Sequence, residues 1–172
     1  MSTALRLAAI AFVLQPVATA SAQDLVITNV RVIVGNGQVV DQGNIVVRGG
    51  RIVSAGAAAA PTGARTIDGR GMTAMPGFID AHRHIMGGNA DQWMKDQAPA
   101  RLQEFLESGY TTLMSGGGPV PGIIQLKEAI EKGQLKGPRI VTSGRADPDS
   151  FKTEADARAA VQRLAKSGVE IL

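Results

Sequence analysis

His82 and His84 are the residues of this chain whose type and spacing point most directly to chemistry. They are the only histidines of the 172 residues, and they stand two apart at the end of an apolar run that Pro76 opens. In a β-strand, residues i and i+2 point to the same face, so both imidazoles can aim at one point while Arg83 is turned away. Imidazole nitrogens are zinc ligands, and catalytic zinc sites keep one position open for water. The spacing therefore predicts half of a metal site.

The chemistry that such a site performs is hydrolysis. A bound divalent metal lowers the pKa of water from 15.7 to about 7 and polarises a carbonyl or phosphoryl oxygen. A lone His-x-His pair is more often an ordinary surface or packing feature. Here the pair closes an apolar strand, and the loop 85–89 that follows it contains two glycines. This context favours a metal site that supplies metal-activated hydroxide.

After Pro76, apolar strand patterns alternate with helical periods. The strands begin near residues 78, 110, 139 and 169, which is about one βα unit per thirty residues. Parallel strands joined by helices form an α/β layer or barrel, and barrel chemistry lies at the C-terminal ends of the strands. A closed (β/α)₈ TIM barrel needs roughly 250 residues. We therefore expect a partial TIM barrel of three to four βα units, in a chain truncated from a longer protein.

Local signals place the helices between these strands. Pro99 suits the first turn of a helix within 91–108. The next helix ends at Gly133, after apolar residues at helical spacing. Thr153 is the expected N-cap of a third helix, with Asp156 completing a variant of the capping box.

The region before residue 73 has the pattern of a small β-structure. Strands are expected at 25–34, 44–48, 51–55 and 66–68. Gly49-Gly50 tolerates the positive φ angles that a two-residue hairpin loop needs. The pattern predicts a small sheet or part of a β-sandwich with a structural role.

The first 22 residues have the layout of a secretory signal peptide. Arg6 provides a basic start, residues 7–14 are apolar, Pro16 breaks the run, and small residues lead to Ala22. The apolar run is too short to span a bilayer, and no later transmembrane segment appears. We expect a periplasmic or secreted protein.

The expected organisation has three parts. These are a signal peptide at 1–22, a β-sandwich portion at 23–73 and the start of a barrel at 74–172.

Composition excludes several classes of function. The formal charge of +3 is small, and no Lys or Arg run resembles a nucleic-acid-binding stripe. The chain has no cysteine, which excludes disulfides, thiolate metal sites and Cys nucleophiles.

Residues 75–84, with the sequence MPGFIDAHRH, resemble the Pro-Gly-x-Ile-Asp-x-His-x-His signature of the amidohydrolase superfamily. Residues 44–56 resemble its N-terminal β-sandwich strands. Residues 109–112 and 137–144 resemble the secreted, imidazolonepropionase-like and prolidase-like branch of that superfamily. The resemblance covers nearly all of the chain after the expected signal peptide.

The resemblance implies a metal-dependent hydrolase on a TIM barrel, with one or two zinc ions or another divalent metal. His82 and His84 would be ligands from the first strand. Asp80 would be a carboxylate that orients a metal ligand without binding the metal itself; the other interpretation is a buried structural acid. The family's remaining ligands, including a carbamylated lysine on the fourth strand, and its catalytic base would follow Leu172. No catalytic residue is therefore assigned within this chain.

The implied activity is hydrolysis of C–N bonds in small-molecule or small-peptide amides by the full-length protein, with this fragment inactive. One alternative is an ester or phosphotriester hydrolase at the same site. Another is a non-catalytic, dihydropyrimidinase-like scaffold that assembles with itself, and the full-length protein could be an oligomer in either case.

A few further residues could take part in recognition. Arg83, Asn89 and Arg145 could contact substrate or be solvated loop residues. Trp93 and Tyr110 are assigned to packing. Residues 116–118, Gly-Gly-Gly, lack the ending of a phosphate loop, which favours a flexible βα loop.

Overall fold

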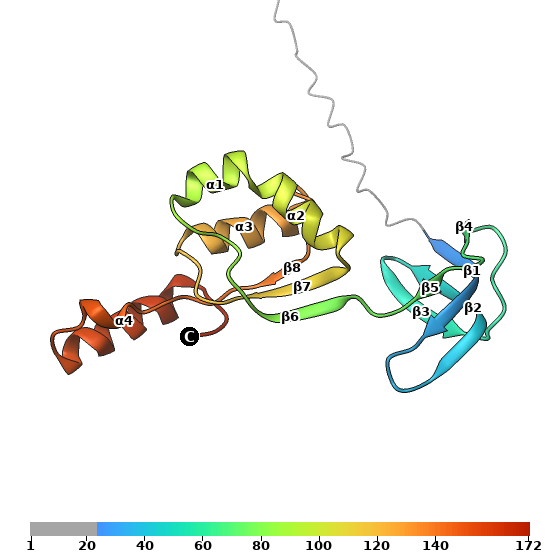
Figure 1. Ribbon diagram of the computed structural model, residues 1–172, viewed down its shortest axis with the longest axis horizontal. Helices are drawn as coiled ribbons and strands as arrows, with labels where there is room; N and C mark the ends of the chain where they lie inside the picture. The colour runs from blue at the N-terminus through green and yellow to red at the C-terminus, as the bar shows by residue number, and fades with distance from the viewer. Residues whose placement is uncertain (1–23) are drawn as a thin grey trace, which may run out of the picture. The chain divides into compact units, whose positions relative to one another are not determined.

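The computed structural model describes residues 24–172, whose contacts divide into one unit that ends at Met75 and a second that begins at Pro76 (Figure 1). The expected signal peptide, residues 1–22, lies outside the described residues. Over residues 24–172 no helix combines the length and the apolar character that crossing a membrane requires.

The first unit is a single five-stranded sheet. Its strands are β1 (Leu25–Ile33), β2 (Val39–Arg48), β3 (Arg51–Gly56), β4 (Arg65–Asp68) and β5 (Thr73–Ala74). They are ordered β3-β2-β1-β4, with β5 paired to β1. Strands β2 and β3 form the expected hairpin, because Gly49 and Gly50 have φ angles of 54° and 75°.

The second unit alternates strands and helices. Its elements are β6 (Phe78–Arg83), α1 (Ala90–Asp96), α2 (Ala98–Glu107), β7 (Tyr110–Ser115), α3 (Gly122–Glu131), β8 (Arg139–Val141), a 3-10 turn η1 (Pro148–Ser150) and α4 (Glu154–Ser167). Strands β6, β7 and β8 form a parallel sheet in that order, and α1, α2 and α3 lie over one of its faces (Figure 1). This is a partial TIM barrel: the described strands do not close.

The core of this unit lies between the sheet and its helices. Leu113 of β7, Leu102 of α2 and Leu126 of α3 are fully buried there. Burial of these apolar side chains stabilises the helices, since short helices are marginal by themselves. Pro99 lies in the first turn of α2, as its fixed φ favours.

The helix boundaries follow local signals. The side chain of Asn89 caps α1 by accepting a hydrogen bond from the backbone N–H of Gln92 at 2.9 Å. Thr153 and Asp156 form the expected capping box of α4, and Gly168 ends that helix with a φ of 92°. The capping box at Thr153, which was predicted from sequence, is confirmed.

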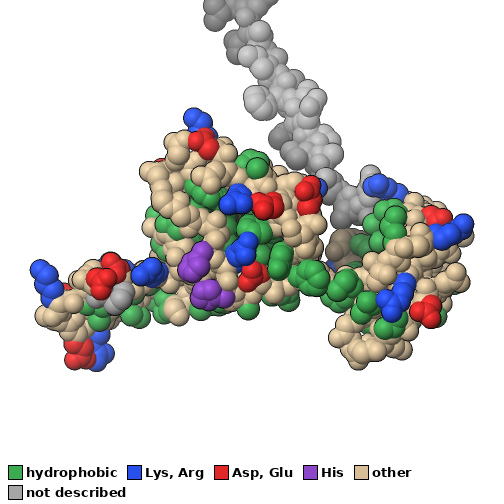
Figure 2. Space-filling view, viewed as in Figure 1, with side chains coloured by type: hydrophobic (Ala, Val, Ile, Leu, Met, Phe, Trp, Pro, Cys, Tyr) green, Lys and Arg blue, Asp and Glu red, His purple; other side chains and the backbone are tan. Residues whose placement is uncertain are grey.

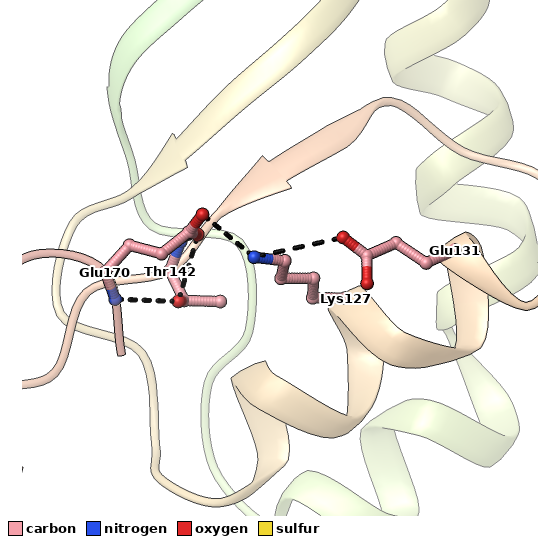
Figure 3. Close-up of polar contacts among 4 residues, drawn as sticks. All are labelled: Lys127, Glu131, Thr142 and Glu170. Atoms are coloured by element: carbon pink, nitrogen blue, oxygen red, sulfur yellow. Dashed lines mark hydrogen bonds and ion pairs between the residues drawn. The ribbon is translucent and has the colours of Figure 1, made fainter. Parts of the chain in front are cut away.

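Residues 169–172, expected to begin a fourth strand, make one isolated parallel bridge, from Ile171 to Ser143 beyond β8. A polar network anchors this segment to the helix layer (Figure 3). Lys127 of α3 lies 2.9 Å from Glu170 Oε1. Glu170 Oε2 accepts hydrogen bonds from the backbone N–H of the fully buried Thr142 at 2.9 Å and from its hydroxyl at 3.2 Å. The network joins α3, the end of β8 and the segment at 170.

This network predicts a pH-dependent contribution to stability. The hydrogen bond from Lys127, followed by that from the Thr142 backbone, holds the pKa of Glu170 below its ordinary value of 4.5. A carboxyl with a lowered pKa stabilises the fold fully above about pH 4.5, and the effect is lost as the pH falls through the folded-state value. We expect Glu170→Gln to lower stability at pH 7 by no more than about 1 kcal/mol, because both side chains are partly exposed.

The measurement is chemical denaturation of the wild type and Glu170→Gln at neutral pH and then stepwise into acid. The difference between them should shrink as the pH falls. The matched control is Glu131→Gln, because Glu131 contacts the same lysine at 3.9 Å with a 62% exposed side chain. A difference for Glu170→Gln that stays constant or grows in acid would contradict the prediction.

Candidate functional site

The two histidines lie side by side at the C-terminal end of β6. His82 is the fifth residue of the strand, and His84 follows its last residue. Their ring centroids are 5.3 Å apart and the ring planes cross at 79°. Figure 2 shows both side chains next to each other at the surface. Both histidines are exposed, and their rings are close enough to bind one metal ion together.

A cavity of about 270 Å³ opens beside this pair. His82, Arg83, His84 and Ile85 form one wall, and α2 supplies the rest through Arg101 and Phe105. The guanidinium carbon of Arg83 lies 5.0 Å from the centre of the Phe105 ring, a cation–π contact that directs this side chain toward α2. The wall is therefore basic and partly aromatic.

The pairing of β6 with β7 contains two irregularities that shape the site. Phe78 pairs with Tyr110 and Ile79 with Thr112, so Thr111 is an extra residue on β7. Asp80 pairs with Leu113, but the next pair is Arg83 with Ser115. The second irregularity sets two residues of β6, Ala81 and His82, opposite one residue of β7, Met114. A bulge of this kind changes the direction of nearby side chains.

The bulge changes the environment expected for Asp80. Strict alternation would put Asp80 on the face of the histidines and Arg83 on the other. Instead the Asp80 carboxylate lies 3.8 Å from the Arg83 guanidinium, while its Oδ1 accepts a hydrogen bond from the backbone N–H of His82 at 3.0 Å. Asp80 thus interacts with the main chain of His82, two residues along the same strand.

The other residues considered from sequence are spread over several places. Arg83 borders the histidine cavity, whereas Asn89 caps α1. Arg145 lines a separate cavity of about 350 Å³ beside α4. Trp93 is 5% exposed within the core, and the ring of Tyr110 packs 5.9 Å from that of Phe78. Only Arg83 is brought together with the two histidines.

The glycine loop after β7 also borders the site. A Cβ atom at Gly116 would lie 3.0 Å from Nε2 of His82. The backbone N–H of Gly117 donates to Ser143 Oγ at 2.8 Å and that of Gly118 to Ser115 Oγ at 3.1 Å. The loop is held by hydrogen bonds. In the sequence, the available signal was that Ser115 and Ser143 each precede a glycine just after a strand. Which backbone groups these serines bind depends on the fold.

The donor set fits a divalent transition metal in part. Two imidazoles are suitable ligands for zinc, and the missing side chain at Gly116 leaves space beside Nε2 of His82. Within residues 24–172, no group of three or more His, Cys, Asp or Glu side chains is arranged to hold a metal ion. The described residues therefore supply two ligands of a site that needs more.

A family model described as "Amidohydrolase family" matches residues 73–171. Among solved structures, a protein from Bifidobacterium longum described as a candidate prolidase is 28% identical, with a TM-score of 0.71 over 87% of this chain and 40% of its own. A Xaa-Pro dipeptidase with bound methionine in its active site is 25% identical, with a TM-score of 0.66 over 86% of this chain and 46% of its own.

A third solved structure is N-acyl-D-glutamate deacylase from Bordetella bronchiseptica, complexed with zinc and a phosphonate inhibitor. It is 21% identical, with a TM-score of 0.62 over 87% of this chain and 37% of its own. At this identity the likeness shows the fold. The chain spans less than half the length of each of these three proteins.

Proposed function

Because the chain belongs to the amidohydrolase family, we propose that the complete protein is a metal-dependent hydrolase of C–N bonds and that this chain is its N-terminal part. The observation that carries the proposal is the pair of adjacent imidazoles at the C-terminal end of β6, the first strand of a parallel βα sheet. Such strand ends are where the active sites of α/β barrels lie. The match of the family model to residues 73–171 supports it.

In this proposal His82 and His84 are metal ligands. The ion would be zinc, singly or as a pair, or another divalent metal; the structurally similar deacylase is complexed with zinc. When bound, it supplies Lewis acidity and acidifies water. The chain's own residues constrain the strand that carries the ligands. The Asp80 carboxylate accepts a hydrogen bond from the backbone N–H of His82. Arg83, which lies between the two histidines in sequence, contacts the ring of Phe105. Because the described residues provide two ligands, hydrolysis is assigned to the complete protein and not to this chain alone.

The proposed substrates are small amides or dipeptides. Two of the similar structures are described by their names as acting on such compounds, the Xaa-Pro dipeptidase and the N-acyl-D-glutamate deacylase. Arg83 and Arg101 line the cavity, and each lies near a carboxylate of the chain, Asp80 at 3.8 Å and Glu104 at 2.8 Å. A substrate carboxylate would therefore have to share these guanidiniums.

We also propose that the protein is exported and that its parts follow the boundaries inferred from sequence. A signal peptide would cover 1–22, the β-sheet portion 23–73 and the barrel would begin at 74. Determination of the N-terminal residue of the protein recovered from the periplasm or medium tests this, with Gln23 expected. An intact Met1 in the mature protein would refute it.

The test of the activity uses the complete protein. Its metal content is measured after purification, and a panel of N-acyl amino acids and dipeptides is screened beside carboxylic esters and a phosphotriester. One to two equivalents of zinc or another divalent transition metal are expected, with turnover of at least one amide. A protein without metal and without amide turnover would overturn the proposal, and turnover of esters alone would redirect it to ester hydrolysis.

A further inference from the structure

Gly116 lies directly against the ring of His82. A Cβ atom built at this position would be 3.0 Å from Nε2, 3.2 Å from Cδ2 and 3.4 Å from Cε1 of the imidazole. The backbone of Gly116 does not adopt a left-handed φ, so its conformation does not require glycine. What requires glycine here is the space occupied by the imidazole edge.

The loop that contains Gly116 has little freedom to retreat. The backbone N–H of Gly116 donates to the carbonyl oxygen of Arg83 at 2.8 Å, which ties it to β6 just after His82. The next backbone N–H, of Gly117, donates to Ser143 Oγ at 2.8 Å. The Ser143 hydroxyl in turn donates to the carbonyl oxygen of Ser115. Both serines are buried, at 0% and 7% exposure.

The imidazole of His82 is less constrained than this loop. His82 is exposed, and β6 has its one described strand partner, β7, on the side of the loop. A side chain at 116 would therefore be accommodated by displacement of the imidazole by a few tenths of an ångström. That displacement takes up much of the roughly 0.5 Å within which a metal ligand must be held, so it should weaken binding without abolishing it.

We propose that Gly116 is a positioning residue for the metal site: it holds no ligand atom, but its missing side chain lets the His82 imidazole take its place beside His84. This inference rests on the proposed function, since it assumes that His82 binds a metal. In this inference the glycine loop sets the position of the His82 ring, because it leaves room for the ring edge that carries Nε2.

The test is Gly116→Ala in the complete protein, with zinc affinity measured by competition against a chromophoric chelator. We expect the dissociation constant for zinc to rise about tenfold, the scale of changes to groups that orient ligands. The absorption spectrum of the cobalt-substituted protein should also shift, because it reports ligand geometry. The matched control is Gly87→Ala, since Gly87 has no left-handed φ and no atom within 4 Å of an added Cβ; it should leave both readouts unchanged.

A double-mutant cycle separates positioning from general structural damage. In a His82→Ala background, Gly116→Ala should cause no further loss of zinc affinity, because the imidazole through which it acts is gone. An equal loss in both backgrounds, or a Gly116→Ala protein with wild-type affinity and cobalt spectrum, would overturn the inference. Loss of cooperative unfolding in Gly116→Ala would overturn it too. It would mean that the backbone, and not the imidazole, moves to relieve the contact with the added methyl group.

The same measurements keep this inference distinct from the proposed function. If His82→Ala loses zinc while Gly116→Ala does not, only the role of Gly116 is refuted. If the wild type binds no metal, or binds it equally well after His82→Ala, both are refuted.

Discussion

Replacing His82 with alanine is expected to weaken zinc binding by the complete protein at least about 100-fold, because a ligand matters more than the groups that orient it. Amide hydrolysis should fall by about 1,000-fold or more, since the metal is assigned several kcal/mol of transition-state stabilisation. The fold should be retained, because His82 is exposed at the end of β6.

Metal content, zinc affinity and turnover of the best amide substrate are the measurements, with thermal unfolding as the check on folding. His84→Ala should behave in the same way, because its ring lies 5.3 Å from that of His82. Gly87→Ala, three residues after His84, is the control and should match the wild type. Unchanged hydrolysis in a folded His82→Ala protein would refute the proposed function.

Local rules were sufficient to predict most elements of the fold. The Gly49-Gly50 hairpin, the capping box at Thr153 and the stop at Gly133 each depend on residues a few positions apart. The apolar spacing of α2 and α3 likewise records which face each helix buries. The order of strands and helices, and hence the partial barrel, follows from such short-range patterns.

The shape of the site could not be predicted in the same way. The bulge beside His82 depends on how β6 and β7 pair, which is a property of two strands about 30 residues apart. Alternation along a single strand therefore separated Asp80 from Arg83, although the structure brings their side chains within 3.8 Å. The adjacency of His82 and His84 was predictable, while the surroundings of Asp80 were not.

The contacts that hold the site's neighbours were also beyond sequence reasoning. Ser143 and Gly117 are 26 positions apart, and Lys127 and Glu170 are more than 40 apart. Glycine-rich sequence is typical of flexible loops, yet the loop after β7 is held by serine hydroxyls and by the carbonyl of Arg83. Only the folded chain shows which polar groups become partners.

Gly77→Ala, at the residue just before β6, is expected to lower stability more than Glu170→Gln. A Cβ atom at Gly77 would lie 2.2 Å from Cγ2, 2.3 Å from Oγ1 and 2.7 Å from Cβ of Thr111, the extra residue on β7. The first two atoms can turn away by rotation of the side chain, but the Cβ moves only with the backbone. Overpacking of this kind costs about 1–3 kcal/mol. The measurement is denaturation of the complete protein by urea, with a lower midpoint expected.

A steric contact thus explains the glycine of the Pro76-Gly77 pair. Without a side chain, Gly77 fits beside Thr111, the extra residue of β7, where the chain enters β6. That reason predicts coupling between the two positions. Thr111→Ala removes the two closest atoms and leaves the 2.7 Å contact, so Gly77→Ala should cost less in the Thr111→Ala background than in the wild type, without becoming neutral. Gly87→Ala, which adds the same methyl group in open space, should leave the midpoint unchanged. Equal losses for Gly77→Ala in both backgrounds would show that Cγ2 and Oγ1 of Thr111 do not cause the destabilisation, and would refute the predicted coupling.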